Sequence, residues 1–123
     1  MSKRILIVDE DLIELNQLSL MLDSRGYEVC PLHQSYKILN EISRCKPDFI
    51  LMDTMFSEMD SMVVSRALGV IETVKDIPLM LILGKDYNHY TYSLKPYGNA
   101  NGNSVKTTDL DTLIENINLR LAS

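Results

Sequence analysis

Apolar residues along this chain occur in two arrangements, short uninterrupted runs and longer stretches with helical spacing. Continuous runs at residues 5–8, 49–52 and 79–83 are typical of strands buried on both faces of a parallel sheet. A shorter segment at residues 27–30, apolar except for Glu28, predicts one more strand. The intervening stretches repeat apolar residues every three or four positions, which predicts helices. These helical stripes comprise Leu15, Leu18 and Leu22; Ile38, Leu39, Ile42 and Cys45; Val63, Ala67, Val70, Ile71 and Val74; and Leu110, Leu113, Ile114, Ile117 and Leu121.

Several residues mark where these helices begin or end. Gly26 is a stop signal after the first helix, and Ser35 and Asp109 are candidate N-caps. The stretch from residue 85 to residue 103 is rich in Tyr, Asn and Gly, so any helix there must be short. Its tyrosines suit either loop packing or a partner-docking patch. A fifth strand is expected to end at residues 104–106.

Strands that alternate with helices imply right-handed crossovers. The predicted fold class is therefore α/β, with a doubly wound, five-stranded parallel sheet between two layers of helices. A chain of 123 residues fits one domain, so we expect a single domain at residues 1–123 without an output domain.

Charge and composition narrow the possible partners. Twelve Lys and Arg against 17 Asp and Glu give a net charge of −5, which argues against direct binding of nucleic acid. No apolar run approaches the roughly 20 residues of a membrane helix, so we expect no membrane association and a cytoplasmic location. The two cysteines, Cys30 and Cys45, match no metal or redox motif and are expected to be free, buried thiols.

Acidic residues follow two of the predicted strands. Asp9, Glu10 and Asp11 follow the first strand, and Asp53 ends the third. Open α/β sheets bind ligands beyond the carboxyl ends of their strands, so carboxylates from two neighbouring strands would converge there. Their mutual repulsion would favour a hard divalent cation, and Mg²⁺ suits oxygen ligands. Taken alone, Asp9 would be better explained as a helix N-cap or an exposed strand end than as a metal ligand.

Other phosphate-binding chemistries fit less well. The sequence contains neither GxGxxG nor GxxxxGK[ST], and a loop that holds phosphate by backbone amides would not carry three acids. A hydrolase that forms an aspartyl phosphate would usually have a second acid two residues after its nucleophile, where this chain has Met55.

Three segments together resemble the receiver domain of two-component response regulators. They are residues 4–11 (RILIVDED), 47–53 (PDFILMD) and 99–106 (NANGNSVK). The resemblance implies a flavodoxin-like sheet of order 2-1-3-4-5, which makes the first and third strands neighbours.

The resemblance also implies roles for individual residues. Asp53 would be the phosphoacceptor, and Lys106 would compensate phosphoryl charge. Glu10, Asp53 and the main-chain carbonyl of Met55 would bind Mg²⁺ directly, with Asp9 acting through water.

The chain also departs from the family at the positions that transmit the signal. Leu83 stands where receivers have a Ser or Thr, and its side chain cannot hydrogen-bond a phosphoryl group. Asn103 stands where an aromatic ring usually moves inward, and Thr107 replaces the proline that follows the family lysine. These departures identify the chain as an atypical member.

Two functions remain open at this point. The first is a receiver that accepts a phosphoryl group from a histidine kinase or phosphotransfer protein and then acts on a downstream protein target. It would be a signalling domain rather than an enzyme, promoting its own phosphorylation and slow dephosphorylation. The alternative is a phosphorylation-independent pseudo-receiver, which would dock a partner on the face formed by the family's fourth helix, fifth strand and fifth helix.

Overall fold

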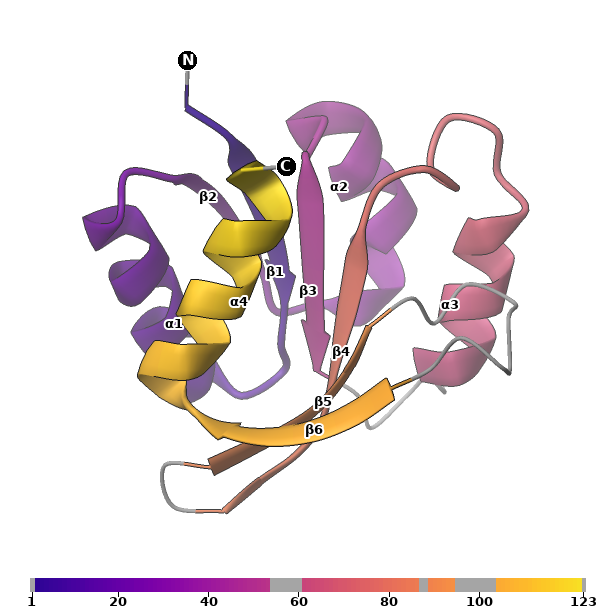
Figure 1. The fold of residues 1–123 in the computed structure, drawn as a ribbon. Helices are drawn as coiled ribbons and strands as arrows, with labels where there is room; N and C mark the ends of the chain where they lie inside the picture. The colour runs from indigo at the N-terminus through magenta and orange to yellow at the C-terminus, as the bar shows by residue number, and fades with distance from the viewer. Residues whose placement is uncertain (1, 54–60, 87–88, 95–103, 123) are drawn as a thin grey trace.

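The computed structural model describes residues 2–53, 61–86, 89–94 and 104–122, which form one mixed sheet covered by helices (Figure 1). The strands are β1 (Arg4–Val8), β2 (Glu28–Leu32), β3 (Phe49–Asp53), β4 (Leu79–Asp86), β5 (His89–Leu94) and β6 (Ser104–Asp109). The helices are α1 (Leu12–Ser24), the 3₁₀ turn η1 (Ser35–Lys37), α2 (Ile38–Cys45), α3 (Ser61–Gly69) and α4 (Leu110–Ala122). None of the described helices is long and apolar enough to cross a membrane.

The first four strands follow the predicted order, β2-β1-β3-β4, and pair in parallel. Helices α1 and α4 lie on one face of this sheet, and α2 and α3 lie on the other (Figure 1). Side chains alternate along each buried strand, so that Ile5 and Ile7 join the core under α1 and α4 while Leu6 and Val8 join the core under α2 and α3. The prediction of a doubly wound, three-layer α/β fold is confirmed.

The prediction that the sheet has five parallel strands is wrong for the second half of the described chain. A sixth strand, β5, lies between β4 and β6 and is antiparallel to both. The register pairs Asp86 with His89, so two residues separate β4 from β5. A parallel strand would need a crossover of a dozen or more residues, whereas an antiparallel one needs only a hairpin. β5 occupies the sheet position next to β4 that the prediction gave to the last strand.

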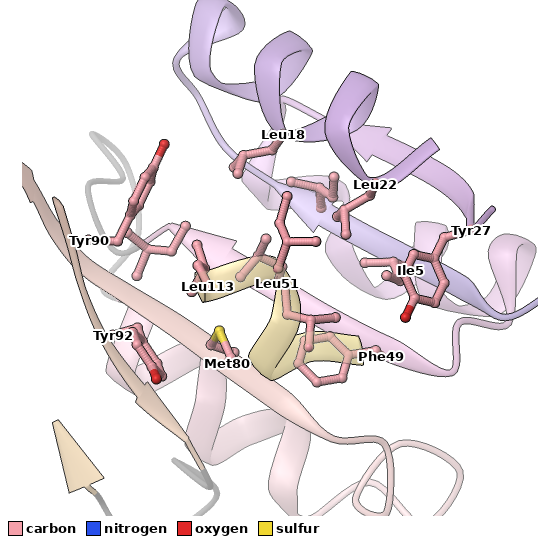
Figure 2. Packing of buried hydrophobic residues seen from close by; sticks show 14 of the residues in the cluster. Ile5, Leu18, Leu22, Tyr27, Phe49, Leu51, Met80, Tyr90, Tyr92 and Leu113 are labelled. Atoms are coloured by element: carbon pink, nitrogen blue, oxygen red, sulfur yellow. The ribbon is translucent and has the colours of Figure 1, made fainter. Parts of the chain in front are cut away.

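Two tyrosines of β5 explain why this strand packs on the sheet. Tyr90 and Tyr92 alternate with Thr91, and each has only 1% of its surface exposed, within the core under α1 and α4 (Figure 2). The Tyr92 hydroxyl accepts a hydrogen bond from the Asn116 side chain on α4 at 2.5 Å. These two rings therefore pack inside the protein and form no docking patch. The other tyrosines of the segment, Tyr87 and Tyr97, lie outside the described residues.

Helix α3 buries a different stripe from the predicted one. Val64 and Leu68 are in the core, whereas Ala67 is exposed and Val70 is 83% exposed. The helix ends at Gly69, so the predicted repeat that runs on to Val74 spans a helix and a separate turn.

Two of the three predicted helix-end residues are confirmed. Gly26 has a φ of 92°, a left-handed conformation that favours glycine, directly after α1. Asp109 caps α4, because its Oδ1 accepts a hydrogen bond from the Thr112 N–H at 2.8 Å. The prediction for Ser35 is wrong, since its hydroxyl makes no cap hydrogen bond and instead donates to Glu10 at 3.0 Å.

The expectation of free thiols is also wrong. Cys30 on β2 and Cys45 at the end of α2 form a disulfide, with their Cα atoms 6.5 Å apart. The crossover from β2 to α2 brings the two residues together, and the sequence spacing of 15 residues gives no sign of it. The disulfide ties an edge strand of the sheet to the helix that covers it.

Candidate functional site

The candidate site lies at the carboxyl ends of β1 and β3. These strands are neighbours, and the pairing of Val8 with Met52 brings Asp9 and Asp53 to adjacent positions at the strand ends. A cavity of about 340 Å³ opens there, lined by Asp9, Asp11, Glu14, Asp53, Ile82, Gly84 and Lys85. The predicted convergence of carboxylates from the first and third strands is thus present.

Three carboxylates meet in this cavity and are almost fully buried. Asp9, Glu14 and Asp53 have 2%, 6% and 7% of their surface exposed. One carboxylate oxygen from each lies within 4.8 Å of the other two. Such an arrangement concentrates negative charge in a place with little access to water, which is costly unless protons or a cation compensate it.

Local structure at the start of α1 fixes two of these acids. The Asp11 side chain caps the helix, with Oδ1 accepting hydrogen bonds from the N–H groups of Ile13 at 2.9 Å and Glu14 at 3.3 Å. The Asp11 N–H in turn donates to Asp9 Oδ1 at 2.9 Å. The loop between β1 and α1 therefore holds Asp9 and the first turn of the helix, which carries Glu14, in one rigid arrangement.

Burial raises the pKa of Asp9 and of Glu14. It is the main reason that the pKa of Asp9 rises from 3.8 to about 8, and the nearby charges of Asp53 and Glu14 raise it further, against the hydrogen bond from the Asp11 N–H. Burial also raises the pKa of Glu14, whereas its hydrogen bond with Asp9 and the positive charge of Lys85 act in the opposite direction. Burial thus favours the neutral forms of both acids when no cation is bound.

The donor set fits a hard divalent cation. Asp9 Oδ2 and Glu14 Oε1 are buried, and apart from the contact of these two acids with each other neither oxygen has a hydrogen-bond partner among the described residues. Buried acceptors without donors are rare in folded proteins and indicate a missing partner. Carboxylate oxygens are the ligands that Mg²⁺ prefers, so Asp9, Glu14 and Asp53 could hold it here.

Glu10 is not one of the three carboxylates that meet in the cavity. Its carboxylate accepts a hydrogen bond from the Ser35 hydroxyl of η1, and among the described residues it belongs neither to the three-carboxylate group nor to the cavity lining. Glu14, five positions after Asp9, is in the group instead. The sequence pattern did not single out Glu14, because an acid in the first turn of a helix is ordinarily explained by the helix dipole.

The two lysines near this end of the sheet have different positions. Lys85 on β4 lines the cavity. Lys106 lies on β6, in a row of paired positions that runs from Asp53 through Ile82 and Tyr92 to Lys106. Three strand spacings, or roughly 14 Å, separate the backbones at the two ends of this row. The predicted role of Lys106 stays a prediction.

The remaining predicted positions are distributed as follows. Leu83 is half-buried and packs on the core under α2 and α3, at the point where the register between β4 and β5 shifts. Met55 and Asn103 lie outside the described residues.

Comparisons with known proteins agree on one kind of domain. No model of a known protein family matches the sequence. The response regulator MprA of Mycobacterium bovis is 33% identical over 86 residues, which cover 70% of this chain and 36% of MprA. The chain therefore corresponds to about a third of the length of that relative.

Solved structures show the same fold. The signal receiver domain of a histidine kinase from Syntrophus aciditrophicus superposes with a TM-score of 0.62 at 27% identity, covering 68% of this chain and 65% of that one. The receiver domain of the sensor histidine kinase PA1611 of Pseudomonas aeruginosa has a TM-score of 0.62 at 23% identity, with 68% of each chain covered, and holds a magnesium ion in its active-site cleft. Sequence similarity, fold and the acidic cavity at the ends of β1 and β3 together identify the chain as a response-regulator receiver domain.

Proposed function

We propose that this domain accepts a phosphoryl group on Asp53 with the help of Mg²⁺. The observation that carries the proposal is the position of Asp53, which lies at the end of β3 inside the acidic cavity with its neighbour Asp9 on β1. The similarity to response regulators supports the same function. The domain would be a signalling protein that promotes its own phosphorylation and slow dephosphorylation.

The chemistry follows from a carboxylate nucleophile. An oxygen of Asp53 would attack phosphorus in line, and the bond from phosphorus to the donor's imidazole nitrogen, or to the oxygen of a small phosphodonor, would break with its electron pair leaving on the donor. Bound Mg²⁺ would supply charge compensation for the phosphoryl oxygens. As the family resemblance implies, Glu10, Asp53 and the main-chain carbonyl of Met55 would bind it directly, and Asp9 would act through water.

Positive side chains must balance the phosphoryl charge as well. The family resemblance assigns this to Lys106, whereas Lys85 is the lysine that lines the cavity. Either lysine would act by pairing with phosphoryl oxygens.

The proposed partners are a histidine kinase or phosphotransfer protein as phosphodonor and a protein as downstream target. The similarity to MprA and to a histidine kinase's receiver domain supports a place in such a relay. Leu83 is half-buried against the core under α2 and α3 and has no hydroxyl to follow the phosphoryl group. We therefore expect phosphorylation to change the loops around Asp53 more than the β5, β6 and α4 side of the domain.

The test is phosphorylation by acetyl phosphate with Mg²⁺, followed by intact-mass measurement. The wild-type chain should gain one phosphoryl group, and Asp53→Asn should gain none, because an amide is not a competent nucleophile. Label that persists in the variant would place the acceptor elsewhere. A wild-type chain that stays unlabelled under these conditions would contradict the proposal and favour the pseudo-receiver alternative.

A further inference from the structure

We propose that the Cys30–Cys45 disulfide is a reversible redox switch that controls how firmly the helical segment at residues 35–45 holds Glu10. The disulfide would open and close by exchange with small thiols such as glutathione. Its effect on the cation rests on the proposed function, which gives Glu10 to Mg²⁺. Its effect on the helical segment depends neither on cation binding nor on phosphoryl transfer.

The two elements that the disulfide joins both contact the loop after β1. At the end of β2, the carbonyl of Leu32 accepts a hydrogen bond from the Asp9 N–H at 3.0 Å. At the start of η1, the Ser35 hydroxyl donates to the Glu10 carboxylate at 3.0 Å. Asp9 and Glu10 are consecutive, so β2 and the helical segment meet at this loop and are joined a second time by the disulfide. Opening the disulfide leaves only the noncovalent half of this connection.

The helical segment connects the disulfide to Glu10 without interruption. η1 ends at Lys37 and α2 begins at Ile38, so residues 35–45 form one continuous helical stretch. With a rise of 1.5 Å per residue, roughly 15 Å separates Ser35 at its start from Cys45 at its end. A tie that is lost at one end therefore loosens the stretch that carries the Ser35 hydroxyl.

Helix α2 has little stability of its own. Its eight residues are fewer than the roughly 12–15 that an isolated helix needs in water. At its N-cap, Lys37 makes no side-chain cap hydrogen bond, and at its C-cap, Lys46 has a φ of 52°, a left-handed conformation that favours glycine. The position of α2 thus depends on tertiary contacts, and the disulfide is the covalent one.

The fold itself should survive reduction. β2 pairs with β1 along its whole length, Ile38 and Ile42 are buried in the core, and the Arg4 guanidinium donates to the Cys45 carbonyl at 3.1 Å. None of these contacts uses a sulfur atom. A domain of 123 residues with a core on each face of its sheet is also large enough to fold without a cross-link. Reduction should therefore loosen α2 without unfolding the protein, as a switch requires.

The exchange begins at the more accessible sulfur. Cys30 is half-buried on the edge strand β2, whereas Cys45 is 3% exposed. The thiolate of a small thiol would attack Cys30 Sγ, and the bond to Cys45 Sγ would break with its electron pair leaving on Cys45, which then takes up a proton. A second thiolate would attack the outer sulfur of this mixed disulfide and release Cys30 as a thiol. Two small thiols thus become one small disulfide while the protein disulfide becomes two thiols, and a small disulfide reverses both steps.

The hydrogen bond from Ser35 gives this switch a chemical effect. Ser35 is 1% exposed, so the packing around it holds its hydroxyl against Glu10 in the oxidised protein. A neighbouring side chain that hydrogen-bonds a metal-binding carboxylate fixes its orientation, and loss of such a bond commonly lowers metal affinity by about tenfold or more. Loosening of residues 35–45 should therefore weaken Mg²⁺ binding through Glu10.

The first test follows the disulfide and the helical segment without Mg²⁺ or phosphodonor. The intact chain is equilibrated in mixtures of reduced and oxidised glutathione, its thiols are alkylated, and its mass is measured. The disulfide should open and close reversibly, and reduction should shift the amide resonances of residues 9–10 and 35–45 while those of α4 stay in place. A disulfide that stays closed in excess reduced glutathione, or reduction that leaves these amides unchanged, would overturn the proposal.

The second test is a Mg²⁺ titration of the oxidised and reduced chains. Reduction should weaken binding by at least about threefold, and Cys30→Ser should bind like reduced wild type with or without reductant. The matched control is Ser35→Ala, which keeps the disulfide but lacks the hydroxyl. It should bind weakly in both redox states, and a full redox response in this variant would overturn the path through Ser35.

Failure of this inference is distinguishable from failure of the proposed function. Mg²⁺ binding that is equal in oxidised and reduced wild type would overturn the switch while leaving phosphorylation of Asp53 intact. Absence of Asp53 labelling by acetyl phosphate would contradict the proposed function, whereas the amide shifts on reduction are measured without any phosphodonor.

Discussion

The stability of the metal-free protein should fall as pH rises from about 4 to about 8. Burial raises the pKa of Asp9 to about 8 in the folded state, whereas an unfolded chain would have the ordinary value of 3.8. Between these values the folded state carries a proton that the unfolded state has lost. A group with a raised folded pKa stabilises the fold fully below the unfolded pKa, and this contribution disappears as pH rises through the folded pKa.

The size of the effect follows from one proton. Each pH unit inside this window should reduce the free energy of unfolding by up to about 1.4 kcal/mol, or about 2.7 kcal/mol between pH 5 and pH 7. A domain of this size is typically stable by about 5–15 kcal/mol, so the change is readily measurable. The raised pKa of Glu14 acts in the same direction.

The assay is urea unfolding followed by far-UV circular dichroism at pH 5, 6 and 7 in the presence of a chelator. Asp9→Asn is the matched control, because its amide keeps the shape of the side chain and cannot titrate. Subtracting the slope of the variant from that of wild type removes the contribution of the acids that do not interact with Asp9. Saturating Mg²⁺ should flatten the wild-type slope, since a bound cation would replace the proton.

A wild-type stability that stays constant or rises with pH, relative to Asp9→Asn, would refute the reasoning. It would mean that Asp9 is ionised in the folded protein without a cation, and that another group in the cavity compensates its charge. An unchanged slope after addition of Mg²⁺ would show instead that the cation and the Asp9 proton occupy different places.

Three further predictions concern other parts of the fold. Reduction of the Cys30–Cys45 disulfide, which closes a loop of 15 residues, should lower the free energy of unfolding by about 3 kcal/mol in urea, and Cys45→Ser should show no further loss on reduction. If Lys85, which lines the cavity, compensates the phosphoryl charge, Lys85→Ala should slow labelling by acetyl phosphate more than Lys106→Ala does. A larger effect of Lys106→Ala would instead support the role that the family resemblance gives to Lys106. Asp11→Ala should cost about 1 kcal/mol of stability through loss of the α1 cap, while Asp11→Ser should retain most of it, as thermal unfolding would show.

Continuous apolar runs predicted the parallel half of the sheet well. Residues 5–8, 49–52 and 79–83 became β1, β3 and the first part of β4, because a strand buried on both faces needs apolar residues throughout. The approach of Asp9 and Asp53 followed from the strand order alone. The family resemblance supplied that order, and the structure has it.

Features that depend on tertiary contact could not be predicted in this way. The alternation of Tyr90 and Tyr92 with polar neighbours is a period-two signal for β5, but the Pro, Gly and Asn residues around it favoured a loop. Glu14 enters the site only because α1 starts where it does, and nothing in its spacing from Asp9 reveals this. The disulfide likewise depends on where β2 and α2 meet.

Because β5 is antiparallel to β4 and β6, the strand pairs of this sheet differ in how long a loop must close before they can form. Asp86 and His89 are near neighbours in the chain, so their strands can meet after closing a very short loop. The pairing of Ile5 with Phe49, in contrast, must bring together segments separated by an entire strand, two α-helices and a 3₁₀ turn. Loop-closure entropy therefore favours early formation of the β4–β5 hairpin, while β1 and β3, which carry the acidic cavity, come together later in folding.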